Sequence, residues 1–331
     1  MYSISFHADG HFEATGTETL LEAATRSQQH WSYSCRAGRC NSCKCRVLSG
    51  QTQALQSEIG LSDEEKAAGW ILACVRTARS DLRLEVDDLI RYPLAPVQTL
   101  PCKISDLQRL APDVMRVSLR LPPNSRFEFL SGQFIELTGP AGIRRSYSLA
   151  KAHAADKILE LHVRAVEAGA LSRYWFTQAR SNDLLRLRGP LGTYFLRETA
   201  ALDLIFLATG TGLAPIKAML ESLCELPAAQ QPRSVSVLWG GRTLQDLYWD
   251  WRNLPHEYRF VPVLSQPHPE WSGQVGHVQD VLLAEQPELK NAVVYACGSP
   301  VMVSSARSTL VEAGLDPHNY HADAFVSSAP L

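Results

Sequence analysis

The sequence has little net charge and no long run of apolar residues. Lys and Arg number 32 and Asp and Glu number 34, so the formal net charge is −2. Nucleic acids and anionic lipid surfaces favour proteins with a strong basic excess, which makes a small molecule or another protein the expected partner. The longest apolar run, near LDLIFLA, is far shorter than the roughly 20 residues that span a bilayer. We therefore expect no nucleic-acid partner and no membrane segment.

The first residues, MYSISFHADG, lack the basic-then-apolar order of a signal peptide, so a cytoplasmic protein is expected. In that reducing compartment, clustered cysteines are explained better by metal or redox chemistry than by disulfides. The chain has 331 residues, of which 45% are apolar. At roughly 150 residues per domain, this length predicts two or three domains.

Four of the eight cysteines lie within the short stretch YSCRAGRCNSCKC. The spacing Cys35-x4-Cys40-x2-Cys43 is typical of a plant-type 2Fe–2S cluster, which takes its fourth thiolate from a distant segment. Cys74, in ILACVRTA, supplies such a residue. Zinc sites usually pair two short knuckles, and Cys74 has no second knuckle around it, so the spacing favours the cluster. Cys45 falls in the predicted strand KCRVLSG, and we expect it to pack as a small thiol.

Residues 1–90 resemble the plant-type ferredoxins in the ligand spacing and in the segments ETLLEAATRSQQHWSYSCRAGRCNSCKCRVLSG and LSDEEKAAGWILACVRTARSDLRLEV. The resemblance implies a β-grasp fold and a 2Fe–2S cluster. Asn41 stands where that family usually has glycine. Because asparagine tolerates left-handed backbone angles, the same loop is expected.

Basic side chains surround the predicted ligands, with no acid between Cys35 and Arg46. They either compensate an anionic four-thiolate cluster or form a docking rim for an acidic partner, and both accounts stay open. The basic residues are Arg36, Arg39, Lys44 and Arg46.

A semi-extended linker is predicted at residues 91–100, where VDDLIRYPLAPVQTLP is rich in proline. Residues 101–199 then alternate apolar and polar positions with period two, as in Val117 and Leu119 against Arg116 and Ser118. Such strands, broken by Gly and Pro, predict an antiparallel β-barrel.

RRSYSLA carries the pattern Arg145-x-Tyr147-Ser148, which resembles the flavin-binding strand of the ferredoxin-reductase family. The resemblance implies that Arg145 pairs with the FAD pyrophosphate, that Tyr147 stacks on the isoalloxazine and that Ser148 lies near flavin N5. Each role suits the side chain, since a guanidinium fork matches phosphate and a flat ring matches a flat ring.

LHVRAVEAGALS resembles a second flavin segment of that family, with Ser172 capping a helix RYWFTQ. Gly169-Ala170-Leu171 departs from the usual Gly-Gly pair, and GPLGTYFL at Gly189–Leu196 resembles the strand that closes the barrel. The cofactor contacts implied here are His162, Val163, Arg164, Gly169 and Ser172.

Residues 200–331 alternate strands and helices, which predicts a parallel-sheet nucleotide-binding domain. LIFLATGTGLAPIKAMLESL places a glycine turn before a helix, and amides there can hold a pyrophosphate. The resemblance extends to the family's nicotinamide domain, in which the turn Cys297–Pro300 lies beside the nicotinamide, although Cys297 could equally be a buried thiol. Phe325, in HADAFVSS, corresponds to a flavin contact. The implied nucleotide contacts are Gly210, Thr211, Gly212, Cys297 and Gly298.

The whole chain thus resembles a ferredoxin–FAD–NAD(P)H reductase, a multidomain protein of α+β and α/β parts. The resemblance implies that electrons pass from NADH to FAD, to the cluster and to a one-electron partner, with Tyr147, Ser148 and Cys297 at the reaction centre. The partner that the resemblance implies is a deoxysugar dehydrase or, alternatively, a bacterial oxygenase. A redox sensor is the third hypothesis, but a sensor needs no hydride source. Arg242 alone is thin support for a 2′-phosphate site, so NADH is expected over NADPH.

Overall fold

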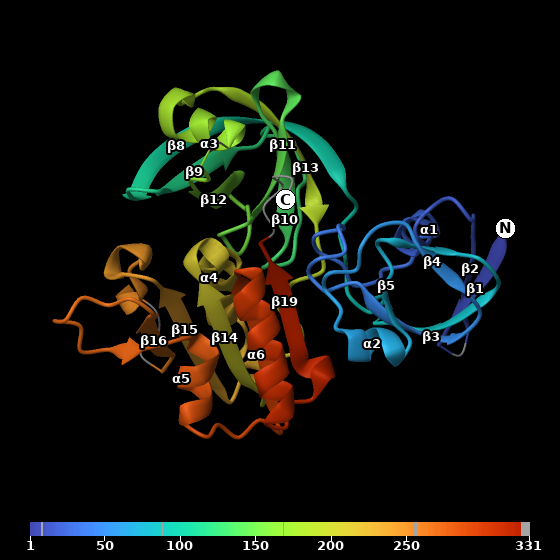
Figure 1. The fold of residues 1–331 in the computed structure, drawn as a ribbon. Coiled ribbons are helices and arrows are strands. Elements are labelled where there is room, and N and C mark those ends of the chain that lie inside the picture. Colours follow the sequence, from blue (N-terminus) through green and yellow to red (C-terminus); the bar gives the residue numbers. More distant parts are fainter. Residues whose placement is uncertain (8, 88, 168, 254–256, 326–331) are drawn as a thin grey trace. The chain divides into compact units, whose positions relative to one another are not determined.

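The computed structural model describes residues 1–331 except 8, 88, 168, 254–256 and 326–331 (Figure 1). The chain divides into two compact units. The first contains Met1–Pro93, Gly192–Tyr194 and the chain from Ala322 onward, and the second contains Leu94–Leu191 and Phe195–His321. Each unit is described by itself.

The first unit holds a five-stranded mixed sheet in the order β2-β1-β7-β3-β5 and a two-stranded sheet of β4 and β6. Strand β1 pairs antiparallel with β2 and parallel with β7, as a β-grasp fold requires. The elements are β1 (Tyr2–Phe6), β2 (Gly10–Ala14), α1 (Leu20–Arg26), β3 (Lys44–Ser49), β4 (Thr52–Ala54), α2 (Asp63–Ala67), β5 (Trp70–Leu72), β6 (Arg76–Ala78) and β7 (Leu82–Glu85).

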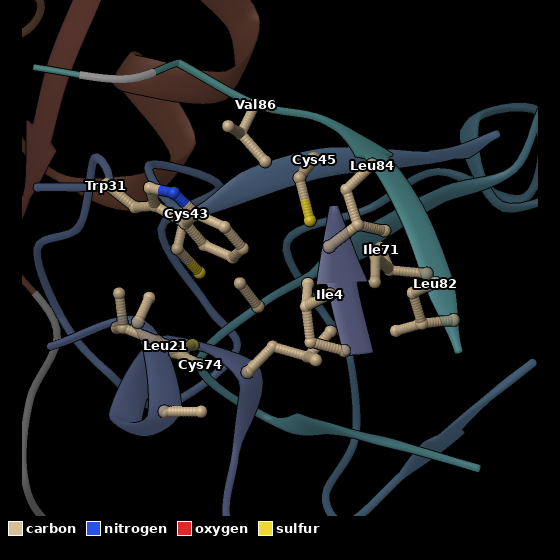
Figure 2. Close-up of a cluster of buried hydrophobic side chains, with 14 of the residues drawn as sticks. Ile4, Leu21, Trp31, Cys43, Cys45, Ile71, Cys74, Leu82, Leu84 and Val86 are labelled. Atoms are coloured by element: carbon tan, nitrogen blue, oxygen red, sulfur yellow. The ribbon is translucent and has the colours of Figure 1, made fainter. Parts of the chain in front are cut away.

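The core of this unit lies between the sheet and α1. Thr19 caps α1 through a capping box with Glu22, which fixes where the helix begins, and Leu20 and Leu21 then enter the core. Figure 2 shows Leu21 and Ile4 in this core together with the side chains of Cys43, Cys45 and Cys74. Cysteine thiols and aliphatic side chains therefore share one apolar interior.

The second unit begins with an antiparallel, barrel-like sheet in the order β11-β10-β13-β8-β9-β12. Ala150, just after β11, donates its N–H to the Glu160 carbonyl of β12 (2.8 Å), so the two edges of the sheet meet. Strand β8 begins at Gln98, inside the segment predicted as a linker. The elements are β8 (Gln98–Ala111), β9 (Val114–Arg120), β10 (Phe134–Thr138), β11 (Arg144–Ser148), β12 (Ile158–Arg164), α3 (Ala170–Arg173) and β13 (Leu184–Leu191).

A parallel sheet in the order β17-β16-β15-β14-β18-β19 follows, with α4, α5 and α6 packed on it (Figure 1). Strand β14 is buried at almost every position and pairs in parallel with both β15 and β18, which makes it the centre of the sheet. The elements are β14 (Asp203–Thr209), α4 (Leu213–Glu225), β15 (Ser234–Gly241), β16 (Arg259–Leu264), β17 (Gln274–Val275), α5 (Val278–Ala284), β18 (Ala292–Gly298), α6 (Pro300–Glu312) and β19 (Tyr320–Ala324).

Candidate functional site

The four predicted cluster ligands form two thiol pairs. Cys35 hydrogen-bonds to Cys40, and Cys43 hydrogen-bonds to Cys74. Cys40, Cys43 and Cys74 are buried and Cys35 is half-buried. Each pair supplies two thiols, which matches the donor set of a 2Fe–2S cluster, because each iron takes two thiolates. Among the described residues, no three or more His, Cys, Asp or Glu side chains are grouped to hold a metal ion.

The hydrogen bond within each pair changes the pKa values of its two thiols. The hydrogen bond from Cys40 lowers the pKa of Cys35 to about 6, and the hydrogen bond from Cys43 lowers the pKa of Cys74. The pKa values of Cys40 and Cys43 are raised well above the usual range by these same bonds and by burial. Each pair thus holds one thiol with a lowered pKa and one with a raised pKa, and binding of a metal cluster would release the protons that these thiols carry.

The loop around the first pair turns its amides toward sulfur. Cys35 donates its N–H to Cys40 Sγ (3.3 Å), and Ala37 donates to Cys35 Sγ (3.4 Å). Asn41 has a φ of 65°, so the expected left-handed conformation at this position is confirmed. Gly38 has a φ of 69°, and a Cβ there would lie 2.5 Å from the Ser57 carbonyl oxygen. The loop therefore has left-handed turns at Gly38 and Asn41, and the position of Gly38 has no room for a side chain.

Cys45 lies in β3, opposite Ile71 of β5. In Figure 2 its side chain lies among the labelled aliphatic residues of the core, and it is 2% exposed. Burial raises the pKa of its thiol to about 12. This position agrees with the prediction that Cys45 packs as a small thiol.

Basic residues around the ligands have protein partners that the local sequence did not reveal. Lys44 binds Glu65 (2.5 Å) and lies 4.1 Å from the centre of the Trp70 ring, while Arg46 donates to the Ala68 carbonyl (3.0 Å). Arg36 is exposed and lies over the Tyr33 ring at 4.1 Å. A carboxylate therefore offsets the charge of Lys44, whereas Arg36 and Arg46 are exposed.

Contacts from distant segments to the cysteine loop were missed by the sequence analysis. The Thr193 hydroxyl accepts the Tyr33 N–H (2.7 Å) and donates to the Tyr33 carbonyl (2.8 Å). Ser34 donates to the carboxylate of Asp323, and burial raises the pKa of Asp323 to about 6. Ser42 donates to the Ala322 carbonyl (3.1 Å). No spacing signal links these positions, because they come from chain segments more than 150 residues apart.

The predicted flavin strand is β11. Tyr147 accepts a hydrogen bond from the Trp175 indole (2.9 Å), which fixes its ring, and burial raises the pKa of Tyr147 to about 12. Ser148 is buried, opposite Phe134 of β10. Arg145 is half-buried, and one of its amino groups donates to the carbonyl of the preceding residue (2.7 Å). The strand therefore presents a half-buried cation and an oriented ring at its end.

Side chains of the second predicted flavin segment bind other side chains of the protein. The ring nitrogens of His162 lie 3.1 Å from the Tyr248 hydroxyl and 3.1 Å from Glu160, which leaves only backbone groups to face a cofactor. Val163, the next residue of β12, is buried at 2% exposure. Arg164 binds Asp113 (2.9 Å) and Asp246 (2.6 Å).

The expected capping by Ser172 is wrong. The residue lies inside α3, and its hydroxyl accepts the Val166 N–H (2.9 Å). The helix starts earlier than expected, at Ala170, so that RYWFTQ continues an existing helix. Gly169 stays close to this bond, since a Cβ there would lie 3.1 Å from the Ser172 hydroxyl.

The two predicted nicotinamide segments pack against each other through glycines. A Cβ on Gly212 would lie 2.2 Å from the Cys297 carbonyl oxygen. Gly298 has a φ of 135°, and a Cβ there would lie 2.2 Å from the Thr209 hydroxyl. Cys297 is fully buried. The turns at the carboxyl ends of the two central strands therefore pack closely through glycines, and this contact is called the nucleotide cradle below. Dinucleotides bind at this edge of such sheets.

Three further predicted contacts are Gly210, Thr211 and Phe325. Gly210 has a φ of 54°, and a Cβ there would lie 2.7 Å from an Arg164 amino group, so a predicted flavin residue and the nucleotide turn are neighbours. Thr211 is buried in the turn Gly210–Gly212. Phe325 is 36% exposed.

No helix in the described part of the chain is long and apolar enough to cross a membrane. Three family patterns match successive parts of the sequence. They are a 2Fe-2S iron-sulfur cluster binding domain at residues 7–79, an oxidoreductase FAD-binding domain at residues 101–195 and an oxidoreductase NAD-binding domain at residues 206–308.

The chain is similar along its whole length to known reductases. CDP-6-deoxy-L-threo-D-glycero-4-hexulose-3-dehydrase reductase of Yersinia pestis is 37% identical over 331 residues, covering 98% of this chain and 99% of that protein. Reductase component 1 of terephthalate 1,2-dioxygenase from Comamonas is 32% identical over 340 residues, covering 99% and 98%. The solved structure of the Amycolatopsis cytochrome P450 reductase GcoB matches with a TM-score of 0.76 and 30% identity, covering 99% of this chain and all of that one.

The fold class and the three cofactor types expected from the sequence are confirmed by these matches. The chain belongs to the family of electron-transferring, NAD(P)H-dependent reductases that join a 2Fe–2S ferredoxin domain to an FAD-binding and an NAD-binding domain.

Proposed function

We propose that this reductase draws electrons from NADH and delivers them singly to a deoxysugar dehydrase. The observation that carries the proposal is the full-length similarity to a dehydrase reductase at 37% identity, against 32% for the oxygenase reductase component. When bound, the flavin and the cluster supply the conversion of a two-electron hydride donor into one-electron delivery. The residues of this chain then have to bind, orient and shield these groups.

For the cluster, we assign Cys35 and Cys40 to one iron and Cys43 and Cys74 to the other. The two thiol pairs support this assignment, because each pair already brings two sulfurs together. Amides of the loop that point at sulfur stabilise negative charge there.

For the flavin, Arg145 is assigned to the pyrophosphate, Tyr147 to the isoalloxazine face and Ser148 to N5. The bond from the Trp175 indole supports the role of Tyr147, because it fixes the plane of the ring before a cofactor arrives. Phe325 is assigned a contact with the flavin. Backbone groups of His162 and Val163, together with Arg164, Gly169 and Ser172, are assigned to the rest of FAD; Arg164 would have to exchange a carboxylate partner for phosphate.

For the nicotinamide nucleotide, the turn Gly210–Gly212 is assigned to the pyrophosphate, and Cys297 and Gly298 are assigned to the nicotinamide side. Close packing at Gly212 and Gly298 supports the assignment, since neither position admits a Cβ and glycines let the backbone approach a dinucleotide. NADH is proposed over NADPH because Arg242, which could hold a 2′-phosphate, is exposed and has no supporting basic cluster in the sequence.

The proposed domain boundaries are 1–90, 91–100, 101–199 and 200–331, and the three family matches fall inside them. A cytoplasmic location is proposed because a cluster of free thiols requires a reducing compartment.

The test supplies NADH, the purified reductase and either a CDP-hexulose dehydrase or an aromatic-ring oxygenase, with NADPH as the comparison donor. Faster single-electron reduction of the dehydrase supports the proposal. Faster reduction of the oxygenase favours the second candidate, for which the 99% coverage by the dioxygenase component is the supporting observation. Equal or higher kcat/KM with NADPH would contradict the NADH assignment.

A further inference from the structure

Glu58 is a buried carboxylate in the loop between β4 and α2, and its side chain is 4% exposed. Its Oε1 accepts the Leu72 N–H (2.7 Å), and its Oε2 accepts two N–H groups of Arg76 (2.6 and 3.0 Å). Arg76 also donates to the Thr52 hydroxyl (2.9 Å). One carboxylate therefore holds both ends of the five-residue stretch from Leu72 to Arg76, and Cys74 is its central residue.

The segment that carries Glu58 also contacts the loop that carries the other three cysteines. Gly60 donates its N–H to the Gly38 carbonyl (2.9 Å). Gly38 leaves room for the Ser57 carbonyl oxygen, which would lie 2.5 Å from a Cβ at that position. Residues 57–60 thus connect the loop of Cys35, Cys40 and Cys43 to the stretch that carries Cys74.

A buried ion pair adds little net stability over apolar residues of the same volume, because both charges must leave water. General stability therefore does not account for an ion pair at this point of the core. The ion pair instead lies beside the ligand segment, because Glu58 binds the Leu72 N–H at one end of the stretch that carries Cys74 and Arg76 at the other.

We propose that Glu58 and Arg76 are positioning residues for the iron–sulfur cluster, which hold Cys74 in register with the ligand loop and balance the charge beside it. This inference rests on the proposed function, because it presumes that the four cysteines bind the cluster. Hydrogen-bonded partners of metal ligands commonly change metal affinity or activity 10–100-fold when replaced. The same size of effect is expected here.

The experiment compares Glu58→Gln, Arg76→Gln and Arg76→Lys in the full chain. We expect all three to lose iron and sulfide to a chelator about 10-fold faster than the parent or more. The cluster midpoint potential should rise in Glu58→Gln, because an unbalanced cation favours the reduced cluster, and fall in Arg76→Gln. Arg76→Lys keeps the charge but loses the fork, so its potential should stay near that of the parent while its cluster loss remains fast.

Glu18→Gln is the matched control. Glu18 binds Arg26 and the Thr15 N–H, which belong to neither ligand segment, so cluster loss and potential should be unchanged. If Glu58→Gln does not fold, the two Arg76 variants still decide. Potentials that do not move, or that move in the same direction in Glu58→Gln and Arg76→Gln, overturn the inference. A parent protein without iron and sulfide would instead overturn the proposed function.

Discussion

The cysteine loop and the nucleotide turns use different parts of the chain to prepare a site. At the cluster site, four side chains carry the chemistry, three from the loop and Cys74 from a separate stretch, and they already stand in two pairs. In the turns Gly210–Gly212 and Cys297–Pro300, the absence of side chains matters, because backbone meets backbone at Gly212 and Gly298. One site depends on the presence of sulfur and the other on the absence of Cβ atoms.

This difference separates two kinds of sensitivity. Replacing a cluster ligand removes a bond to iron, which no neighbour can supply, whereas filling the nucleotide cradle displaces backbone and leaves the sulfur chemistry intact. The two sites also belong to separate compact units. Substitutions in one unit should therefore damage one half of the electron route and spare the other.

The largest effect is expected from Cys74→Ser. The cluster should be lost or unstable, since Cys45 is fixed in β3 among core residues and cannot replace the missing thiolate. NADH oxidation with a two-electron dye should continue, while reduction of a one-electron protein partner should stop. Iron and acid-labile sulfide, expected near two of each per chain in the parent, measure the first part.

Cys45→Ser is the matched control for that experiment and should keep a normal cluster. An intact cluster in Cys74→Ser, together with cluster loss in Cys45→Ser, would show that the ligand was assigned to the wrong cysteine.

The next effect is expected from Gly298→Ala, in which the new Cβ would lie 2.2 Å from the Thr209 hydroxyl. Overpacking of this kind costs about 1–3 kcal/mol, and the shift falls on the cradle, so NADH-driven activity should drop about tenfold or more. The visible and EPR signals of the cluster should be unchanged.

Gly276→Ala separates the clash from backbone strain. Gly276 has a φ of 125°, close to the 135° of Gly298, but nothing lies within 4 Å of a Cβ there. It should lose stability without a comparable loss of NADH turnover. Equal damage in both variants would mean that strain, and not the filled cradle, is responsible.

A more local effect is expected from Arg145→Ala. Loss of a charge-assisted phosphate contact should weaken FAD by roughly 1.5–3 kcal/mol, measured as the dissociation constant of the apoprotein for FAD. Arg144→Ala is the control, because alternation along β11 places Arg144 on the other face, where its guanidinium lies 3.8 Å from Glu136. If Arg144→Ala weakens FAD as much as Arg145→Ala, the assigned face of the strand is wrong.

The sequence predicted the residues whose chemistry is a property of their type and failed where chemistry depends on distant partners. The cluster loop and its left-handed Asn41 could be predicted from the spacing Cys35-x4-Cys40-x2-Cys43, because all these residues are close together in the sequence. The side chain of His162 could not be placed, because its partner Tyr248 lies 86 residues away. Ser172 was wrongly assigned as a cap, since the helix starts at Ala170, before it. Glu58 gave no signal, because its importance arises only when Leu72 and Arg76 come together around it.

The smallest effect is expected at the basic residues around the ligands, where the structure divides a rim that the sequence treated as uniform. If exposed charge steers an acidic partner, the association rate should fall as the Debye length shortens from about 10 Å at 0.1 M salt to about 3 Å at 1 M, while ferricyanide reduction changes less. Arg36→Gln should reduce this salt dependence, because Arg36 is exposed over Tyr33. Lys44→Gln should alter it less, because Glu65 at 2.5 Å already offsets that charge. Stopped-flow association rates with the partner measure both variants, and an equal salt response in the partner and ferricyanide assays would leave compensation of the cluster's own charge as the role of these residues.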